Sequence, residues 1–67
     1  MIEIQLNGKL HQLKKSVNIS NLLKTLQISE KKVAVEINGK VISKDIYKNH
    51  IINNKDVVEI VTFIGGG

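Results

Sequence analysis

Two Asn-Gly pairs, Asn7-Gly8 and Asn38-Gly39, constrain the fold of this chain more than any other feature of its sequence. Each pair lies between two short runs in which apolar and polar residues alternate, the pattern of a strand with one buried face. The type I′ turn of a two-residue hairpin needs positive φ at both central residues, which Asn and Gly tolerate best. The sequence therefore predicts two β-hairpins. The first would pair Ile2 with Leu13, Ile4 with His11 and Leu6 with Lys9.

Between the two hairpins the apolar period changes from two residues to three and four, which is typical of a helix with one buried stripe. The residues of this stripe are Ile19, Leu22, Leu23 and Leu26. Asn18 is placed to cap the first turn, with Val17 and Leu22 as a hydrophobic staple. Since no glycine follows, we expect the helix to end at about residues 27–29.

The last strand, residues 57–63, is apolar in both phases, as a central strand would be. Glu59 indicates which phase faces solvent, so Val58 and Ile60 should face the helix. Val61 and Phe63 would then form an exposed apolar patch, a candidate docking surface for a partner. Residues 43–55, before this strand, have no clean period. They predict one helical turn at 44–48, with Ile46 and Tyr47 against the body of the domain, and a turn at 53–56.

Together these elements predict an α+β fold of the β-grasp (ubiquitin-like) type. A mixed sheet of four to five strands would have one helix packed across one face, with the last strand parallel to the first. A ferredoxin-like layout would need a second full helix, for which residues 43–55 are a poor candidate. The β-grasp domain would span residues 1–62, and residues 63–67 would form a flexible C-terminal tail.

Three glycines follow directly on the apolar run Val57 to Ile64, with no polar linker between. A backbone without Cβ can thread a narrow slot, and it ends here in an α-carboxylate that is ionised at neutral pH. We therefore expect Gly67 to carry the working group of the protein, although a frayed terminus is the simpler alternative. The threading segment would be Ile64, Gly65, Gly66 and Gly67.

The composition of the 67 residues excludes several other kinds of site. There is no Cys for a disulfide or a thiolate metal site, which fits a reducing cytoplasm, and all ten basic residues are Lys. A chain without Arg and with only two aromatic residues is a poor nucleic-acid reader, so at a net charge of +4 we favour an acidic protein partner. No apolar run is long enough to cross a membrane. We assign no catalytic, metal-binding or cofactor-binding role to any residue, and expect His11 and His50 to be a partly covered and a surface histidine.

Three stretches carry a resemblance to a known family. They are Val-x-Val-Glu-x-Asn-Gly at residues 33–39, Asp-Val-Val-Glu-Ile-Val at 56–61 and Phe-Ile-Gly-Gly-Gly at 63–67. With them the whole chain resembles the ThiS family, the sulfur carrier proteins of thiamin biosynthesis. Lys55 stands where the family often has a glycine. The terminal diglycine alone is shared with the small subunit of molybdopterin synthase and with ubiquitin-like modifiers.

The resemblance implies that the protein is a co-substrate of other enzymes and not an enzyme itself, and that it is located in the cytoplasm. A ThiF-like adenylating enzyme would join the Gly67 carboxylate to AMP, using ATP that the enzyme itself binds. A sulfur donor with a persulfide cysteine would then convert it to a thiocarboxylate, and a ThiG-like thiazole synthase would take up that sulfur. Sulfur supply to molybdopterin, conjugation to a partner's lysine and a plain interaction module are the alternatives.

Overall fold

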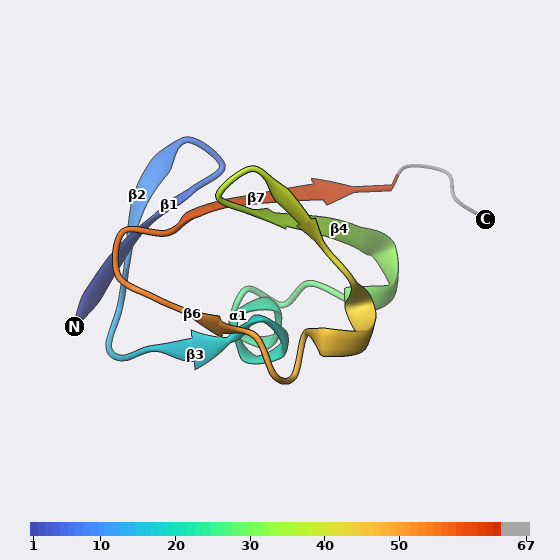
Figure 1. Cartoon of the computed structure of the whole chain (residues 1–67), viewed down its shortest axis with the longest axis horizontal. Helices are drawn as coiled ribbons and strands as arrows, with labels where there is room; N and C mark the ends of the chain where they lie inside the picture. Colours follow the sequence, from blue (N-terminus) through green and yellow to red (C-terminus); the bar gives the residue numbers. More distant parts are fainter. Residues whose placement is uncertain (64–67) are drawn as a thin grey trace.

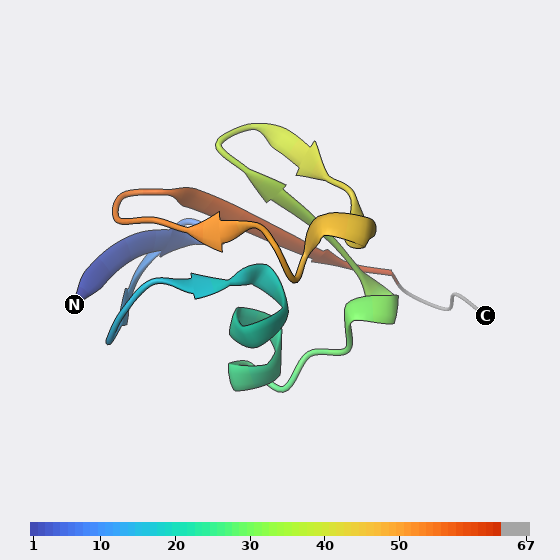
Figure 2. The ribbon, with the colours of Figure 1, turned by 60° about the horizontal axis from the view of Figure 1, so that its bottom comes forward.

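The protein folds around a mixed sheet of five strands in the order β2-β1-β7-β4-β5 (Figure 1). The computed structural model describes residues 1–63, and the predicted threading segment, residues 64–67, lies outside the described residues. The strands of this sheet are β1 (Ile2–Leu6), β2 (Lys9–Leu13), β4 (Val33–Ile37), β5 (Lys40–Ile42) and β7 (Val57–Thr62). One α-helix, α1 (Ile19–Thr25), lies across one face of the sheet (Figure 2), which confirms the predicted α+β architecture.

Both hairpin turns form at the Asn-Gly pairs as predicted. The φ angles are 49° and 83° at Asn7 and Gly8, and 53° and 85° at Asn38 and Gly39, so all four residues have the positive φ of a type I′ turn. The register of the first hairpin also confirms the prediction. Its partners are Ile2 and Leu13, Ile4 and His11, and Leu6 and Lys9.

The last strand, β7, lies in the middle of the sheet. It runs parallel to β1, with Gln5 opposite Val57, and antiparallel to β4, with Val33 opposite Thr62. The side chains of both turn asparagines extend this pairing. Asn7 Oδ1 accepts a hydrogen bond from the Ile60 N–H at 2.7 Å, and Asn38 Oδ1 accepts one from the Val57 N–H at 2.8 Å. β7 is therefore held by two backbone neighbours and by two side chains that stand where those neighbours turn away.

The helix begins as predicted but ends earlier. Asn18 is its N-cap, and its side chain accepts a hydrogen bond from the Asn21 N–H at 2.7 Å. The expected end at residues 27–29 is wrong, because α1 stops at Thr25 and Gln27 takes a φ of 60°. The Ile28 N–H then donates to the Leu23 carbonyl at 2.9 Å, which with the Gln27 N–H on Lys24 forms a Schellman motif. Gln27 occupies the position that glycine usually takes, so the sequence carried no stop signal.

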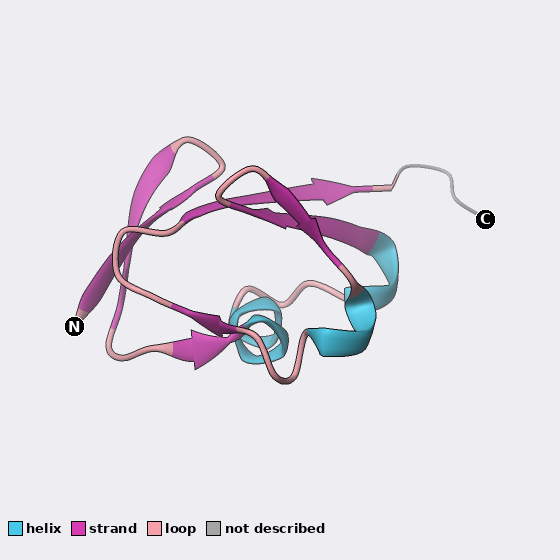
Figure 3. Cartoon of the chain, viewed as in Figure 1, coloured by secondary structure: helices cyan, strands magenta, loops and turns pink. Residues whose placement is uncertain are grey.

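A second, two-stranded sheet was not predicted. Its antiparallel strands are β3 (Val17–Asn18) and β6 (Ile51–Ile52). Two 3-10 turns complete the described elements, η1 (Glu30–Lys32) and η2 (Lys44–Ile46), and Figures 1 and 3 show both at the end of the sheet where β7 finishes. The helical turn predicted at 44–48 corresponds to η2. Tyr47 is buried there as expected, but Ile46 is 43% exposed, so its predicted packing against the domain is wrong.

The core lies between α1 and the inner face of the sheet. α1 contributes Ile19, Leu22 and Leu23, and the central strands contribute Val33, Val35 and Val58, all nearly inaccessible to solvent. The opposite face of the sheet has no covering element in the described part of the chain (Figure 2). No described helix has the length and apolar character needed to span a bilayer.

This core predicts a large effect for Leu22→Ala. Leu22 is 1% exposed, so truncation leaves a cavity and should lower the free energy of unfolding by roughly 2–5 kcal/mol. Leu10→Ala is the matched control, since Leu10 is 71% exposed and the same change there should stay within about 0.5 kcal/mol. Denaturant unfolding followed by circular dichroism measures both. Equal effects of the two substitutions would mean that α1 does not pack as described.

Candidate functional site

The described part of the candidate site is the end of β7, where the chain leaves the sheet. Val61 and Phe63 are 58% and 52% exposed, whereas Val58 and Ile60 are buried toward α1. The predicted orientation of β7 is therefore confirmed. The predicted role of Val61 and Phe63 in docking a partner stays a prediction, and Gly67, Gly66, Gly65 and Ile64 lie outside the described residues.

Phe63 is fixed by contacts from both 3-10 turns. Its N–H donates to the carbonyl of Lys32 in η1 at 2.8 Å. From η2, the Lys44 ammonium lies 5.6 Å from the centroid of the Phe63 ring, a distance at which a cation is attracted to the aromatic face. The same ammonium donates to the Lys31 carbonyl at 3.3 Å, so Lys44 ties the two turns to each other. These contacts set where the chain leaves the domain.

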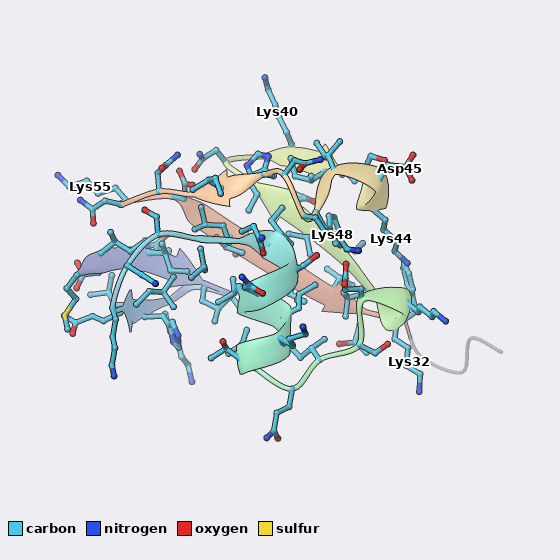
Figure 4. All side chains as sticks on the ribbon, turned by 90° about the horizontal axis from the view of Figure 1, so that it is seen from below. Lys32, Lys40, Lys44, Asp45, Lys48 and Lys55 are labelled. Atoms are coloured by element: carbon cyan, nitrogen blue, oxygen red, sulfur yellow. The ribbon has the colours of Figure 1, made fainter. Side chains whose placement is uncertain are left out.

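The two turns that contact Phe63 thus carry three exposed lysines, and we call Lys31, Lys32 and Lys44 the lysine collar. Figure 4 shows Lys44 reaching from η2 toward η1, where Lys32 lies, whereas Lys40 and Lys55 lie on other parts of the surface. Sequence reasoning missed this cluster. The doublet Lys31-Lys32 was the available signal, but it is indistinguishable from ordinary solvated surface until the fold brings Lys44 beside it.

Tyr47 anchors η2 beneath the lysine collar. Its N–H donates to the Lys44 carbonyl at 3.2 Å and its carbonyl accepts from the Ser20 N–H at 3.3 Å, so η2 is tied to α1. The side chain is 1% exposed, and within residues 1–63 no hydrogen bond of acceptable geometry reaches its hydroxyl oxygen. Burial raises the pKa of Tyr47 above its ordinary value of 10.0, while the nearby backbone of Val35 lowers it in part and the charge of Glu30 raises it further.

The open face of the sheet beside Val61 carries two glutamates in direct opposition. Glu36 on β4 and Glu59 on β7 are register partners, so their side chains leave the sheet on the same face. Like charges placed opposite each other in an antiparallel pair destabilise it. Val41 and Val57, both exposed, lie on the same face. Around the end of β7, an apolar patch thus lies between negative charge on the sheet and positive charge at the collar.

Neither of the two histidines belongs to the candidate site at the end of β7. His11 is half-buried and, with Lys14 and Lys15, lines a shallow hollow of about 320 Å³ between β2 and α1. The backbone of His50 donates to Ile46 and accepts from Ile19, a structural role in the turn before β6. Within the described ranges no three His, Cys, Asp or Glu residues gather closely enough to hold a metal ion.

Comparisons with known proteins identify a family for this chain. The ThiS family model matches residues 4–67 of the chain. The sulfur carrier protein ThiS of Bacillus subtilis is 43% identical over 65 residues, 96% of this chain and 98% of that protein. A thiazole synthase of Magnetococcus marinus is 38% identical over 66 residues, which span 98% of this chain and 20% of that protein. The crystal structure of the thiamine biosynthesis protein ThiS from Geobacter metallireducens aligns with a TM-score of 0.86 at 30% identity, covering 98% of this chain and all of that one.

The burial of Tyr47 predicts a pH dependence of stability. Because the folded state holds the proton more tightly, this contribution to stability should be fully present below pH 10.0, the ordinary pKa, and be lost as the pH rises through the higher folded pKa. Tyr47→Phe removes the ionisable group and an unpartnered hydroxyl, so it should unfold with equal or greater free energy near neutral pH and lose less of it at alkaline pH. Denaturant unfolding on both sides of pH 10.0 measures this.

Tyr47 is the single tyrosine of the chain, so the ultraviolet absorbance of tyrosinate reports on this group alone. In the folded parent protein this signal should rise at higher pH than in the denaturant-unfolded chain. Coinciding titrations, or the same alkaline loss of stability in Tyr47→Phe, would contradict the burial of this hydroxyl.

Proposed function

This chain belongs to the ThiS family, the sulfur carriers of thiamin biosynthesis, and from that premise we propose that it carries the sulfur as a thiocarboxylate on Gly67. A partner adenylating enzyme of the ThiF type would first join the Gly67 carboxylate to the α-phosphate of ATP, releasing pyrophosphate. The outer sulfur of a persulfide cysteine on a sulfur donor would then attack the acyl carbon and displace AMP, which gives an acyl disulfide. A second thiol would cleave its S–S bond, releasing the thiocarboxylate on Gly67 and forming a disulfide with the donor cysteine. A thiazole synthase of the ThiG type would consume the thiocarboxylate in forming the thiazole ring.

The observation that carries this proposal is the position at which the chain leaves the sheet after β7. The central strand of the sheet ends at Thr62, and the exposed Phe63 that follows is fixed in position by Lys32 and Lys44. Gly65, Gly66 and Gly67 come after it in the sequence. Fully extended, residues 63–67 would span at most about 17 Å. That reach would let a terminal carboxylate enter a buried site of a partner while the folded domain stays outside it.

The residue chemistry supports a co-substrate acted on by other enzymes. The chain has no Cys, so no thiol of its own could intercept an activated acyl group at Gly67. The catalytic steps are therefore assigned to partners, and ATP to the adenylating enzyme. The relative named thiazole synthase supports the last step, since a segment similar to this whole chain makes up a fifth of that protein. We further propose a cytoplasmic location, in keeping with the absence of Cys.

We assign docking of the adenylating enzyme to Val61 and Phe63. Phe63→Asp should leave the fold intact, because the side chain is half exposed and its backbone hydrogen bond to Lys32 remains. Removing an aromatic anchor from the centre of an interface should weaken binding about tenfold or more. Titration calorimetry with the adenylating enzyme of the same organism measures the affinity, and circular dichroism checks the fold. Leu10→Asp is the control, since it places the same charge on an exposed site at the far edge of the sheet.

The tail itself gives the decisive test of the proposed function. Gly66→Val should fold like the parent but fail to form the acyl-adenylate, because a β-branched side chain would clash in a slot shaped for bare backbone. One alanine added after Gly67 should be as damaging, since it moves the carboxylate about 3.5 Å beyond the α-phosphate. ATP–pyrophosphate exchange with the adenylating enzyme of the same organism is the assay. Lys9→Ala, an exposed change in the first hairpin, is the control that should exchange normally.

Equal exchange by the parent, Gly66→Val and the extended chain would overturn the assignment of the Gly67 carboxylate as the functional group. Mass spectrometry of the protein isolated from its own cells gives an independent check. Replacement of one oxygen by sulfur at Gly67 supports the carrier, whereas an adduct on a partner's lysine would identify a protein modifier.

A further inference from the structure

The charges around the end of β7 are not neutralised by their acidic neighbours. η1 and η2 each carry one acidic residue beside the lysines of the collar, Glu30 and Asp45. The Glu30 carboxylate is half-buried and accepts a hydrogen bond from the Ser20 hydroxyl of α1 at 3.0 Å. Figure 4 shows Asp45 and Lys44 leaving η2 in different directions. The collar therefore presents a net positive charge on the side of Phe63.

Negative charge is held on the other side of the same apolar patch. Val61, opposite Ala34, separates Phe63 from the opposed pair Glu36 and Glu59. Two carboxylates in direct register repel each other, which lowers the stability of the central β4–β7 pairing. A cation placed over both would remove that repulsion. From Glu36 and Glu59 to the collar, the surface thus changes sign across Val61 and Phe63.

We propose that this change of sign orients the carrier on its adenylating enzyme. The enzyme would present acidic side chains around the mouth of the slot that admits the tail, opposite Lys31, Lys32 and Lys44. One arginine or lysine of the enzyme would lie over Glu36 and Glu59, and an apolar surface between them would meet Val61 and Phe63. The proposal rests on the function proposed above and adds the chemistry of the partner's surface.

The physical reason for such an arrangement is orientation. An apolar patch alone is non-directional, so it allows many rotations of one protein on the other. Complementary charges at the two ends of the patch penalise the wrong rotations and speed the right encounter. Because the chain emerges beside the collar, pairing the collar with acids at the mouth of the slot would direct the tail into it.

Charge reversal at the collar tests the proposal. Lys32→Glu is the main variant, because the hydrogen bond from Phe63 uses the backbone carbonyl of Lys32 and should survive the change. It should raise the KM for the carrier in ATP–pyrophosphate exchange about tenfold at low salt, with little change in kcat. At about 1 M salt, where the Debye length is near 3 Å, most of that difference should vanish. Lys40→Glu is the matched control, with the same charge change on an exposed lysine that projects elsewhere (Figure 4).

Three further variants separate charge from structure. Lys44→Arg keeps the charge and should behave like the parent, while Lys44→Glu should resemble Lys32→Glu. Glu59→Lys should raise the thermal stability of the fold by removing the repulsion, yet weaken docking by repelling the enzyme's cation. If Glu59 affected only the stability of the fold, Glu59→Lys would raise the thermal stability and lower the KM.

The outcomes distinguish this proposal from the proposed function. The KM values of Lys32→Glu and Lys44→Glu could equal that of Lys40→Glu while Gly66→Val is inactive. That result would overturn the oriented docking and leave the carrier function standing. If the raised KM of the charge-reversal variants persisted unchanged at high salt, the contact would not be electrostatic, and the oriented docking would also be overturned. Full exchange by Gly66→Val would overturn the carrier function itself. Weaker binding to the thiazole synthase alone would assign the charged surface to that partner and contradict the proposal.

Discussion

Two asparagine side chains, together with the backbone ladders to β1 and β4, hold β7 in place, and most of the structure depends on β7. Asn7 and Asn38 each occupy a left-handed position in a hairpin turn and each use the side-chain oxygen to accept a backbone N–H of β7. The two residues thus form the hairpins and join them through the strand between them. An unpaired N–H on a central strand would cost free energy, so these bonds also close the ladder where β1 and β4 turn away. One residue type at two turns therefore links local hairpin geometry to the order of the whole sheet.

The parts of the fold that follow from local chemistry could be predicted from the sequence. An Asn-Gly turn fixes hairpin register, a polar N-cap fixes the start of α1, and the single charge of Glu59 fixes which side of β7 meets solvent. The parts set by distant contacts could not. Gln27 ends α1 in a conformation that glycine usually takes, and the residue that follows it, Ile28, packs against the hydrophobic core. The lysine collar joins residues 13 positions apart, and no spacing rule relates Lys31 to Lys44.

Under the proposed function, docking on a partner and carrying the reactive group fall to different parts of the chain, whereas many proteins combine these tasks at one place. Membership of the ThiS family assigns sulfur transport in thiamin biosynthesis to a chain whose described residues hold no metal-binding cluster and no Cys. Their contribution is shape and charge at the surface: exposed Val61 and Phe63, and lysines and glutamates on either side of them. Under the proposed function the reactive carboxylate is carried beyond this surface. The domain can then present one surface to a partner while the reactive group lies inside a buried site of that partner.

The placement of β7 between β1 and β4 has a mechanical consequence. A partner that draws the tail inward would pull along the axis of β7, and the hydrogen bonds of that strand run across this axis to its neighbours. A load in this direction shears the bonds together instead of opening them one after another, so the ladder shares it. The Phe63–Lys32 bond stands at the loaded end and the two asparagine side chains toward the other. The strand that leads to the tail is therefore also the one best placed to withstand tension on it.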